Sequence, residues 1–536
     1  MRDDVRIADR SGRLALVCAH AMVLAAIAWL AARIVAINGG RFGYTLDDAY
    51  IHLSMSEQIA AGGYGVNANE YAAAASSILY PLLLAPGAGF FWHEYLPMAI
   101  GIACVSFSLN VIRIYLGTVG FGASPAARWA VAVLSVGFVL AFNVVGVAFS
   151  GMEHSLHILL AMLTVLGLIR HLEEGKPPAW LVPVLILGPL VRYEALALNL
   201  AVIAVLASNR AWRPALLGLG GIALSVAGFS VFLIAIGQAP LPSSVLAKSY
   251  SAAAGMGGTW LGVIAGVIAN VIRAATEWGG LATICAGLFG AVTAWRLRGD
   301  SGAHDERRRV AALVLAAATG AHVVAGGFNW FHRYEIYIVT AAAMLIVYLV
   351  REPVLAFWRR SGGIVRTTVA GLTAMAIVGY PYLIATVRDI PLAASNIYQQ
   401  QYQMHRFVND FHHGPVAVND LGWVSYRNPD YVLDLWGLGS EEARRQRAVD
   451  PTSAWMARMV SARGIRLAMV YADWFSGGVP DNWVLVATLQ LGHERVSSAR
   501  AAVEFYATVP AAADELRSEL HAFASTLPDG IALNFN

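Results

Sequence analysis

The hydrophobic residues of this chain gather in long runs that are separated by short polar segments. A membrane-spanning helix needs roughly 20 mostly apolar residues, and fewer when it packs inside a bundle. The pattern predicts about eleven spans, at 14–37, 94–116, 129–149, 154–170, 179–191, 195–208, 214–236, 279–295, 310–326, 334–350 and 367–386. The first run is too long for the core of a signal peptide and shows no convincing cleavage site, so we interpret it as a span.

One further apolar segment, 257–277, is interrupted by Arg273 and Glu277. If this segment were a span, the arginine-rich loop at 296–309 would lie on the outer side of the membrane. We therefore predict an interfacial or re-entrant helix on the outer face.

The pattern changes after about residue 387, where charged residues and Pro/Gly turns appear and the apolar runs shorten. Short runs of this length, alternating with helical patterns, are typical of an α/β domain. The predicted strands are 416–418, 431–435, 467–471 and 484–490, and the predicted helices are 441–448 and 453–463. The sequence thus predicts an α-helical polytopic membrane domain at 1–386 and a soluble α/β domain at 387–536.

Arginine and lysine residues gather on one side of the predicted membrane. Counting the spans alternately, this side receives Arg2, Arg6, Arg10, Arg13, Arg128, Arg170, Lys176, Arg210, Arg213, Arg296, Arg298, Arg307, Arg308, Arg309, Arg351, Arg359, Arg360 and Arg366. The opposite side receives the segment 38–93, which carries four carboxylates and a single arginine. Short loops rich in Lys and Arg stay in the cytoplasm, so we predict a cytoplasmic N-terminus and an extracytoplasmic C-terminal domain.

The composition agrees with a membrane protein. Apolar residues make up 58% of the 536 residues and charged residues only 13%, against about 25% charged in soluble proteins. This excludes an ordinary cytoplasmic enzyme and a disordered chain, and a net charge of +3 is too small to indicate nucleic-acid binding. The cysteines (Cys18, Cys104 and Cys285) lie in apolar runs, which excludes a disulfide framework and a cysteine-based metal site.

Candidate catalytic residues occur at the start of the first outer loop, which reads Tyr44-Thr45-Leu46-Asp47-Asp48-Ala49-Tyr50-Ile51-His52. Burial and mutual repulsion both raise the pKa of neighbouring carboxylates, which suits a general base that works near neutral pH. The simpler interpretation is that one aspartate caps a helix running from Ala49 to Ala60. The two interpretations are compatible, with one aspartate capping and the other reacting.

Other polar residues that interrupt apolar surroundings are predicted at the same face. They are Glu153, His154, Arg192, Glu194, Lys248, His332 and Arg333. A single Arg or Lys at the end of a span more often reaches for the headgroups, and Arg192 with Glu194 is also explained by a structural ion pair. Together, however, these residues supply acids to deprotonate an acceptor and cations to stabilise a departing phosphate.

Metal binding is not indicated by the histidines, because the spacing of His93, His154 and His332 matches no metal signature. In the C-terminal domain, Asn419-Asp420-Leu421-Gly422 is first of all a turn. Trp423, Trp436 and Trp474 are candidates to stack on the sugar rings of a polymeric acceptor, although core packing is the more common use of each.

Several of these segments, in this order, resemble the GT-C class of integral-membrane glycosyltransferases, and in particular the branch that contains the mycobacterial terminal arabinofuranosyltransferase. The matching segments are LDDAYIHLSMSEQIAAGGYGVN (46–67), SGMEHSLHILL (150–160), VRYEAL (191–196), LPSSVLAKS (241–249), NWFHRYEIYIV (329–339) and VNDLGWVSYRNPDYVLDLWGL (418–438). The chain departs from the relatives' pattern at 72–78, 192–194 and 242–244, which leaves the sugar and the acceptor open.

The resemblance implies an inverting glycosyltransferase of a bacterial inner membrane. It would move a sugar, with arabinofuranose favoured over mannose, from a polyprenyl-phosphate donor to an envelope glycan or glycolipid on the outer side. Its base would be Asp47 or Asp48, with Asp47 favoured. The remaining roles are donor-phosphate binding by Lys248, Arg333, His332 and Arg192, and orientation of sugar or acceptor by Glu153, Glu194, Tyr50 and His52. No cofactor is required, and the sequence does not decide whether Mg²⁺ or Ca²⁺ takes part.

Two other classes of protein remain as alternatives, a transporter or flippase of lipid-linked sugars and a non-catalytic scaffold for envelope assembly. Transporters place ionisable groups near the bilayer midplane and are often built from repeated halves. Here the ionisable groups gather at one face and no repeated half is visible, which favours the glycosyltransferase.

Overall fold

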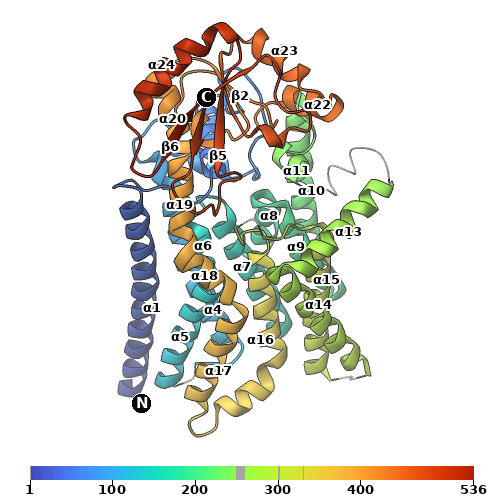
Figure 1. Ribbon diagram of the computed structural model, residues 1–536. Helices are drawn as coiled ribbons and strands as arrows, with labels where there is room; N and C mark the ends of the chain where they lie inside the picture. The colour runs from blue at the N-terminus through green and yellow to red at the C-terminus, as the bar shows by residue number, and fades with distance from the viewer. Residues whose placement is uncertain (1, 123, 249–259, 300–301, 330) are drawn as a thin grey trace.

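The structure is a computed structural model that describes residues 2–122, 124–248, 260–299, 302–329 and 331–536, with the side chains of 2–10 and 247–248 left out of the description. Apolar helices form a bundle, and a domain built around a β-sheet covers one end of it (Figure 1). The N-terminus lies at the other end of the bundle. The segment 38–95, the first loop of the chain, and the C-terminal domain therefore meet at the same end of the molecule.

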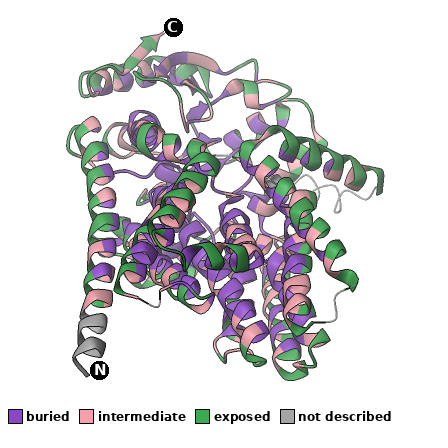
Figure 2. Cartoon of the chain, turned by 90° about the horizontal axis from the view of Figure 1, so that it is seen from below, coloured by how far each residue is buried: buried purple, intermediate pink, exposed green. Residues whose placement is uncertain are grey.

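Seven helices of the described residues are long and apolar enough to cross a membrane. They are α1 (Arg2–Ile37), α4 (Leu96–Thr118), α7 (His154–Glu174), α10 (Trp212–Ala235), α14 (Trp278–Arg296), α15 (Ala303–Ala325) and α16 (Ile336–Trp358). Each coincides with a span that the hydrophobic runs predicted. Exposed residues cover the outer surfaces of the helices and buried ones gather inside the bundle (Figure 2). Many exposed residues are apolar, such as Leu224, as expected for helices that contact lipid.

Other apolar helices are shorter, namely α5 (Pro125–Ala141), α8 (Leu181–Val191), α9 (Leu196–Ser208) and α13 (Trp260–Thr276). The predicted span at 129–149 is wrong as a single helix, because Asn143 separates α5 from α6 (Val144–Ala148). Asn143 has a φ of 54°, a left-handed conformation that asparagine tolerates better than most residues. Its side-chain oxygen accepts a hydrogen bond from Thr386 at 2.9 Å. The total of about eleven spans stays a prediction.

The last predicted span, 367–386, is also not one straight helix. Helix α17 (Gly363–Val378) meets the helical segment Tyr380–His412 at an angle of 77°. A Cβ on Gly379, between them, would lie 2.1 Å from the carbonyl oxygen of Ala141, so only glycine fits there. The second segment consists of α18 (Tyr380–Ile384), η5 (Ala385–Asp389), α19 (Ile390–Gln399), α20 (Gln401–Phe407) and η6 (Val408–His412). It runs from the bundle into the C-terminal domain, and the predicted boundary at 386/387 falls inside it.

The C-terminal domain contains a six-stranded sheet of order β2-β1-β3-β5-β4-β6. The strands are β1 (Val416–Val418), β2 (Val432–Asp434), β3 (Leu467–Val470), β4 (Val484–Gln490), β5 (Ala502–Ala507) and β6 (Ala532–Phe535). The first three are parallel, and the other pairings are antiparallel. The four predicted strands and the two predicted helices, α22 (Glu441–Val449) and α23 (Ala454–Ala462), are confirmed, whereas β5 and β6 were not predicted. Helices α21 (Gly422–Ser425) and α24 (Ala513–Ala524) complete the domain.

The first loop contains short helices that connect the two parts of the molecule. They are α2 (Asp48–Ala60), α3 (Tyr80–Leu84), η1 (Ala85–Gly87) and η2 (His93–Tyr95). Short helices outside this loop are η3 (Tyr193–Ala195), α11 (Ser243–Lys248), η4 (Leu297–Gly299), η7 (Ala472–Trp474) and η8 (Pro510–Ala512). Ile51 and Met55 of α2 share one buried cluster with Val418 and Met469 of the sheet. Because apolar burial is the main favourable term in folding, the loop and the sheet domain form a common core.

The tightest contact between the two parts is made by Gly422 at the start of α21. A Cβ at this position would lie 2.1 Å from the carbonyl oxygen of Asp47 and 2.6 Å from its carboxylate carbon. Both neighbours are atoms of Asp47 in the first loop, so a side chain here would push the C-terminal domain away from the bundle.

We predict that Gly422→Ala destabilises the protein by about 1–3 kcal/mol, the usual cost of overpacking a close contact. Thermal unfolding in lipid nanodiscs, followed by tryptophan fluorescence, measures the effect. Gly414→Ala is the matched control, because the nearest atom to its Cβ would be 3.7 Å away, on the side chain of His412. Equal melting temperatures for the two variants would contradict the contact.

Candidate active site

Asp47 and Asp48 have different surroundings although they are adjacent. The Asp47 carboxylate is buried and accepts hydrogen bonds from the backbone amides of Gly422 at 2.6 Å and Trp423 at 2.8 Å. The Asp47 side chain therefore caps α21. It makes no capping hydrogen bond to α2, the helix that begins at the next residue. Burial raises the pKa of Asp47 well above its usual value, and the nearby Asp420 carboxylate adds to this shift against the effect of the two amides.

Asp48 lies in the first turn of α2, and 20% of its side chain is exposed. Its Oδ2 accepts a hydrogen bond from Nη2 of Arg333 at 2.8 Å. Arg333 is itself buried, and the same nitrogen donates to the hydroxyl of Tyr334 at 3.1 Å. Asp48 is thus an accessible carboxylate oriented by a rigid guanidinium, whereas both carboxylate oxygens of Asp47 hold backbone amides.

Backbone geometry near Arg333 is unusual. Asn329, Phe331 and His332 have φ values of 63°, 66° and 53°, a left-handed conformation that is uncommon for residues other than glycine. The buried Glu335 holds this turn, since its Oε2 accepts the backbone amide of Asn329 at 2.9 Å. Such strain is frequent at functional sites, where the surrounding structure must hold it in place.

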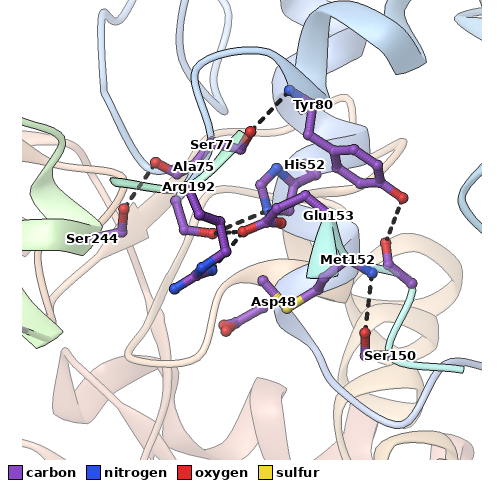
Figure 3. A network of polar contacts seen from close by, with 12 residues as sticks. Asp48, His52, Ala75, Ser77, Tyr80, Ser150, Met152, Glu153, Arg192 and Ser244 are labelled. Atoms are coloured by element: carbon purple, nitrogen blue, oxygen red, sulfur yellow. Dashed lines mark hydrogen bonds and ion pairs between the residues drawn. The ribbon is translucent and has the colours of Figure 1, made fainter. Parts of the chain in front are cut away.

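A second polar network lies where the first loop meets α7 and α8 (Figure 3). Arg192 donates to Oε1 of Glu153 and to Oε1 of Glu194, at 2.6 Å in each case. Glu153 is fully buried, and it also accepts from Ser76 at 2.8 Å and lies 3.1 Å from Nε2 of His52. The predicted ion pair of Arg192 with Glu194 is present, and Glu153 is part of the same network.

A cavity of about 750 Å³ lies between α9, α13 and α15, beside this network. Its polar lining consists of Ser76, Arg192, Tyr193, Glu194, Ser244, Asn270, Arg273, His322 and Tyr334. The rest of the lining is mostly apolar, including Leu196 and Leu200 of α9 and Ala317 and Ala321 of α15. Leu200 is 44% exposed. The cavity therefore combines a charged region with an apolar wall.

The residues predicted for the site are only partly brought together. Arg192 and Glu194 line the cavity, Glu153 and His52 lie behind Arg192, and Arg333 joins Asp48 to Tyr334 at the cavity edge. The side chain of Lys248, at the end of α11, lies outside the described part of the structure.

Of the predicted residues whose side chains are described, Arg192 and Glu194 alone line the cavity, and two others belong to different contacts. His332 packs edge-on against Tyr382 and lies 3.7 Å from Oε1 of Glu335. The ring of Tyr50 is fully buried and stacked on Trp423 at 3.8 Å, so it has no surface to offer a sugar. Its role is to pack the first loop against α21.

Sequence reasoning missed Ser244, Asn270, Arg273, His322 and Tyr334. Arg273 carried a signal, because it interrupts the apolar run at 257–277. Tyr334 lies under two arginines, with the guanidinium carbons of Arg192 and Arg333 at 5.4 and 5.0 Å from its ring centre. The contact of Arg192 with Tyr334 joins residues that are distant in the sequence, so the local pattern does not predict it.

Comparison with known proteins gives limited likenesses. A family model described as "Domain of unknown function (DUF8728)" matches residues 395–506, within the C-terminal domain. No curated protein matches the chain.

Among solved structures, the chain is similar to the Archaeoglobus fulgidus oligosaccharyltransferase tethered to an acceptor peptide with the NVT sequon, at 10% identity and a TM-score of 0.45, over 96% of this chain and 75% of that one. For the same archaeal protein in complex with an inhibitory peptide and a dolichol-phosphate, the identity is 10% and the TM-score 0.40, over 91% and 74%. Arabinofuranosyltransferase AftD from mycobacteria shares 15% identity at a TM-score of 0.40, over 91% of this chain and 41% of that one.

These neighbours are of the class that the sequence motifs predicted, membrane glycosyltransferases that include a mycobacterial arabinofuranosyltransferase. Their TM-scores lie below 0.5, so these likenesses alone carry no conclusion about the function of this chain.

We predict that Arg192→Met destabilises the protein by about 3–5 kcal/mol, because it leaves Glu153 and Glu194 buried without their cation. The double variant Arg192→Met/Glu153→Gln, which removes one of the uncompensated charges, should unfold at a higher temperature than Arg192→Met alone. Arg309→Met, which breaks an exposed ion pair with Glu306, is the control and should leave the melting temperature unchanged. A double variant less stable than Arg192→Met would show that the network is not governed by charge balance.

Proposed function

We propose that this protein transfers a sugar from a polyprenyl-phosphate donor to a hydroxyl of an acceptor glycan at the outer face of the membrane. The observation that carries the proposal is the cavity, which combines an apolar wall on α9 and α15 with a charged region around Arg192, next to the Asp48–Arg333 pair. A lipid-linked phosphate sugar has the same two parts, an apolar chain and a polar head.

In this proposal, the donor phosphate binds beside Arg192 and Arg273. Ser76 and Ser244 lie at the same site, but their hydroxyls donate to Glu153 and to the carbonyl oxygen of Ala75. All four residues line the cavity. The lipid chain extends along α9 and α15 toward the surface of the bundle. Charge-assisted hydrogen bonds stabilise the negative charge that develops on a departing phosphate, which is the main chemical task in breaking the sugar–phosphate bond.

Asp48 acts as the general base. The acceptor oxygen forms a bond to the anomeric carbon, the bond from that carbon to the phosphate oxygen breaks, and polyprenyl phosphate leaves with the bonding electrons. The hydroxyl proton passes to the Asp48 carboxylate, and the anomeric configuration is inverted. Arg333 holds Asp48 in place for this transfer, while Asp47 binds α21 and keeps the loop in position. A direct displacement of this kind does not require a divalent cation.

The finer assignments belong to the same proposal. The distribution of Lys and Arg favours a cytoplasmic N-terminus and an extracytoplasmic C-terminal domain in a bacterial inner membrane. Arabinofuranose is the favoured sugar, mannose the second, and an envelope glycan or glycolipid the acceptor.

We predict that Asp48→Asn lowers the release of polyprenyl phosphate by about 10²–10⁴-fold, the usual contribution of a positioned general base. Purified protein in nanodiscs would be given polyprenyl-phosphate arabinofuranose, mannose or glucose together with glycan acceptors. Donor binding should stay within about threefold of wild type, because Asp48 does not hold the phosphate. Asp473→Asn, at an exposed ion pair with Arg500, is the control and should keep full turnover. Wild-type turnover in Asp48→Asn would refute this role.

The apolar wall can be tested separately. Ala321→Phe would place a ring in the cavity and should raise the KM for a long-chain donor at least tenfold, with a smaller effect on a donor whose lipid has only a few carbons. Ala291→Phe makes the same change at an exposed position on α14 outside the cavity lining and should leave KM unchanged. Identical KM values for both variants and both donors would mean that the lipid does not lie along α15.

A further inference from the structure

Helix α13 is attached to the rest of the protein along one narrow face. Its buried residues form a single row with a spacing of four: Gly266, Asn270 and Ala274. The amide of Asn270 donates hydrogen bonds to the carbonyl oxygens of Val324 and Gly326 at the end of α15, at 3.2 Å each. Ala274 lies close to α14, since a Cβ on Gly280 would be 2.3 Å from the Ala274 carbonyl oxygen. The buried row therefore holds α13 to α14 and α15.

The opposite face of α13 is exposed and apolar. Its residues form a second row with the same spacing: Trp260, Ile264, Ile268 and Ile272. The two rows are two residues out of step, so they lie about 200° apart on a helix with 3.6 residues per turn. No residue of α13 before Arg273 is charged. A helix that is apolar all round is normally buried in a protein core or in a membrane, yet the protein buries three of the 17 residues of α13.

Lipid is the occupant that the surroundings of this exposed row favour. The chain passes at Glu277 directly into α14, which is one of the seven candidate spans and exposes Leu281, Leu288 and Val292. The apolar surface of α13 therefore adjoins that of a helix that crosses the membrane. At 1.5 Å per residue α13 is about 25 Å long, shorter than the roughly 30 Å hydrocarbon core, and it slants outward from the bundle (Figure 1). A short apolar helix of this kind fits within one leaflet.

The same helix forms one wall of the large cavity. Asn270 and Arg273 belong to the cavity lining, and both lie away from the exposed row. The hydrogen bonds of Asn270 fix one point of α13 on α15. Because the protein holds this wall along a single row of small contacts, its position depends on what covers the other side.

From these observations we propose that α13 is embedded in the lipid leaflet on the side of the C-terminal domain, and that this lipid holds α13 against the large cavity as one of its walls. The use of that wall rests on the proposed function, in which Arg273 lies beside the donor phosphate. A charge on the exposed row would draw α13 toward water, because a charged side chain is costly in hydrocarbon. Arg273 would then move away from the phosphate, whereas Asp48 and Arg333 lie on other segments of the chain.

Spin labels test the lipid contact independently of any reaction. In the full-length protein in nanodiscs, with the native cysteines replaced by alanine, a label on Ile268→Cys should collide with oxygen, which concentrates in lipid, and not with a water-soluble nickel chelate. Labels on Leu288→Cys of α14 and on Asp514→Cys of α24, both exposed, are the lipid and water references. A label at Ile268 that behaves as the one at Asp514 would overturn the proposal. A label shielded from both reagents would place a protein partner, such as a second copy of this chain, on the exposed row and would also overturn it.

Binding of polyprenyl phosphate, without an acceptor, tests the wall. Ile268→Glu should raise its Kd tenfold or more, and Ile264→Glu, one turn away, repeats the test if the first variant melts at a lower temperature. Val449→Glu adds the same charge at an exposed apolar residue of α22, in the C-terminal domain, and should stay within twofold of wild type.

These measurements also separate the wall from the proposed reaction. Equal binding of polyprenyl phosphate by wild type, Ile268→Glu and Ile264→Glu would overturn the lipid-held wall, whether or not the protein transfers a sugar. Binding that both variants weaken, in a protein that releases no polyprenyl phosphate from any donor, would support the wall and refute the reaction.

Discussion

The structure depends on one buried contact, in which the Asp47 carboxylate accepts the backbone amides of Gly422 and Trp423. A buried carboxylate is costly unless its oxygens accept hydrogen bonds. Here the donors are the amides of Gly422 and Trp423, which follow Asp47 by 375 and 376 positions in the sequence. The contact fixes the start of α2, and with it Asp48, relative to the C-terminal domain. It also brings the Trp423 ring onto Tyr50, which closes the gap between the loop and α21 with apolar surface. The C-terminal domain is therefore part of the framework that positions the candidate base.

The two polar clusters at this face divide the chemical tasks. Arg192 and its glutamates form a buried network that borders the cavity, and Arg333 connects Asp48 to Tyr334 at its edge. Tyr334 lies against both guanidinium groups, so the clusters share one aromatic ring. Removing water from such groups strengthens their electrostatic interactions. In the proposed reaction, this arrangement places the leaving phosphate on one side of Tyr334 and the base on the other.

Local features were predictable from the sequence, and pairings between distant segments were not. The long apolar runs predicted the seven long helices because twenty consecutive apolar residues carry the signal by themselves. The break at Asn143 was missed because it depends on Thr386, and strand β5 was missed although it lies between β3 and β4. The adjacent aspartates were found as candidates, but their division into a cap and an accessible carboxylate is decided by Gly422 and Arg333. Arg273 was noted as an interruption in an apolar run, and its place at the cavity depends on how α13 packs against α14 and α15.

The central claim is that the large cavity holds a lipid-phosphate donor with its sugar directed at Asp48. Electron cryomicroscopy of the protein in nanodiscs with a non-cleavable phosphonate analogue of polyprenyl-phosphate arabinofuranose tests it most directly. The account predicts density for the lipid along α9 and α15, the phosphonate within hydrogen-bonding distance of Arg192 or Arg273, and the anomeric carbon facing the Asp48 carboxylate. An analogue bound elsewhere in the bundle, or with its sugar turned away from Asp48, would contradict it.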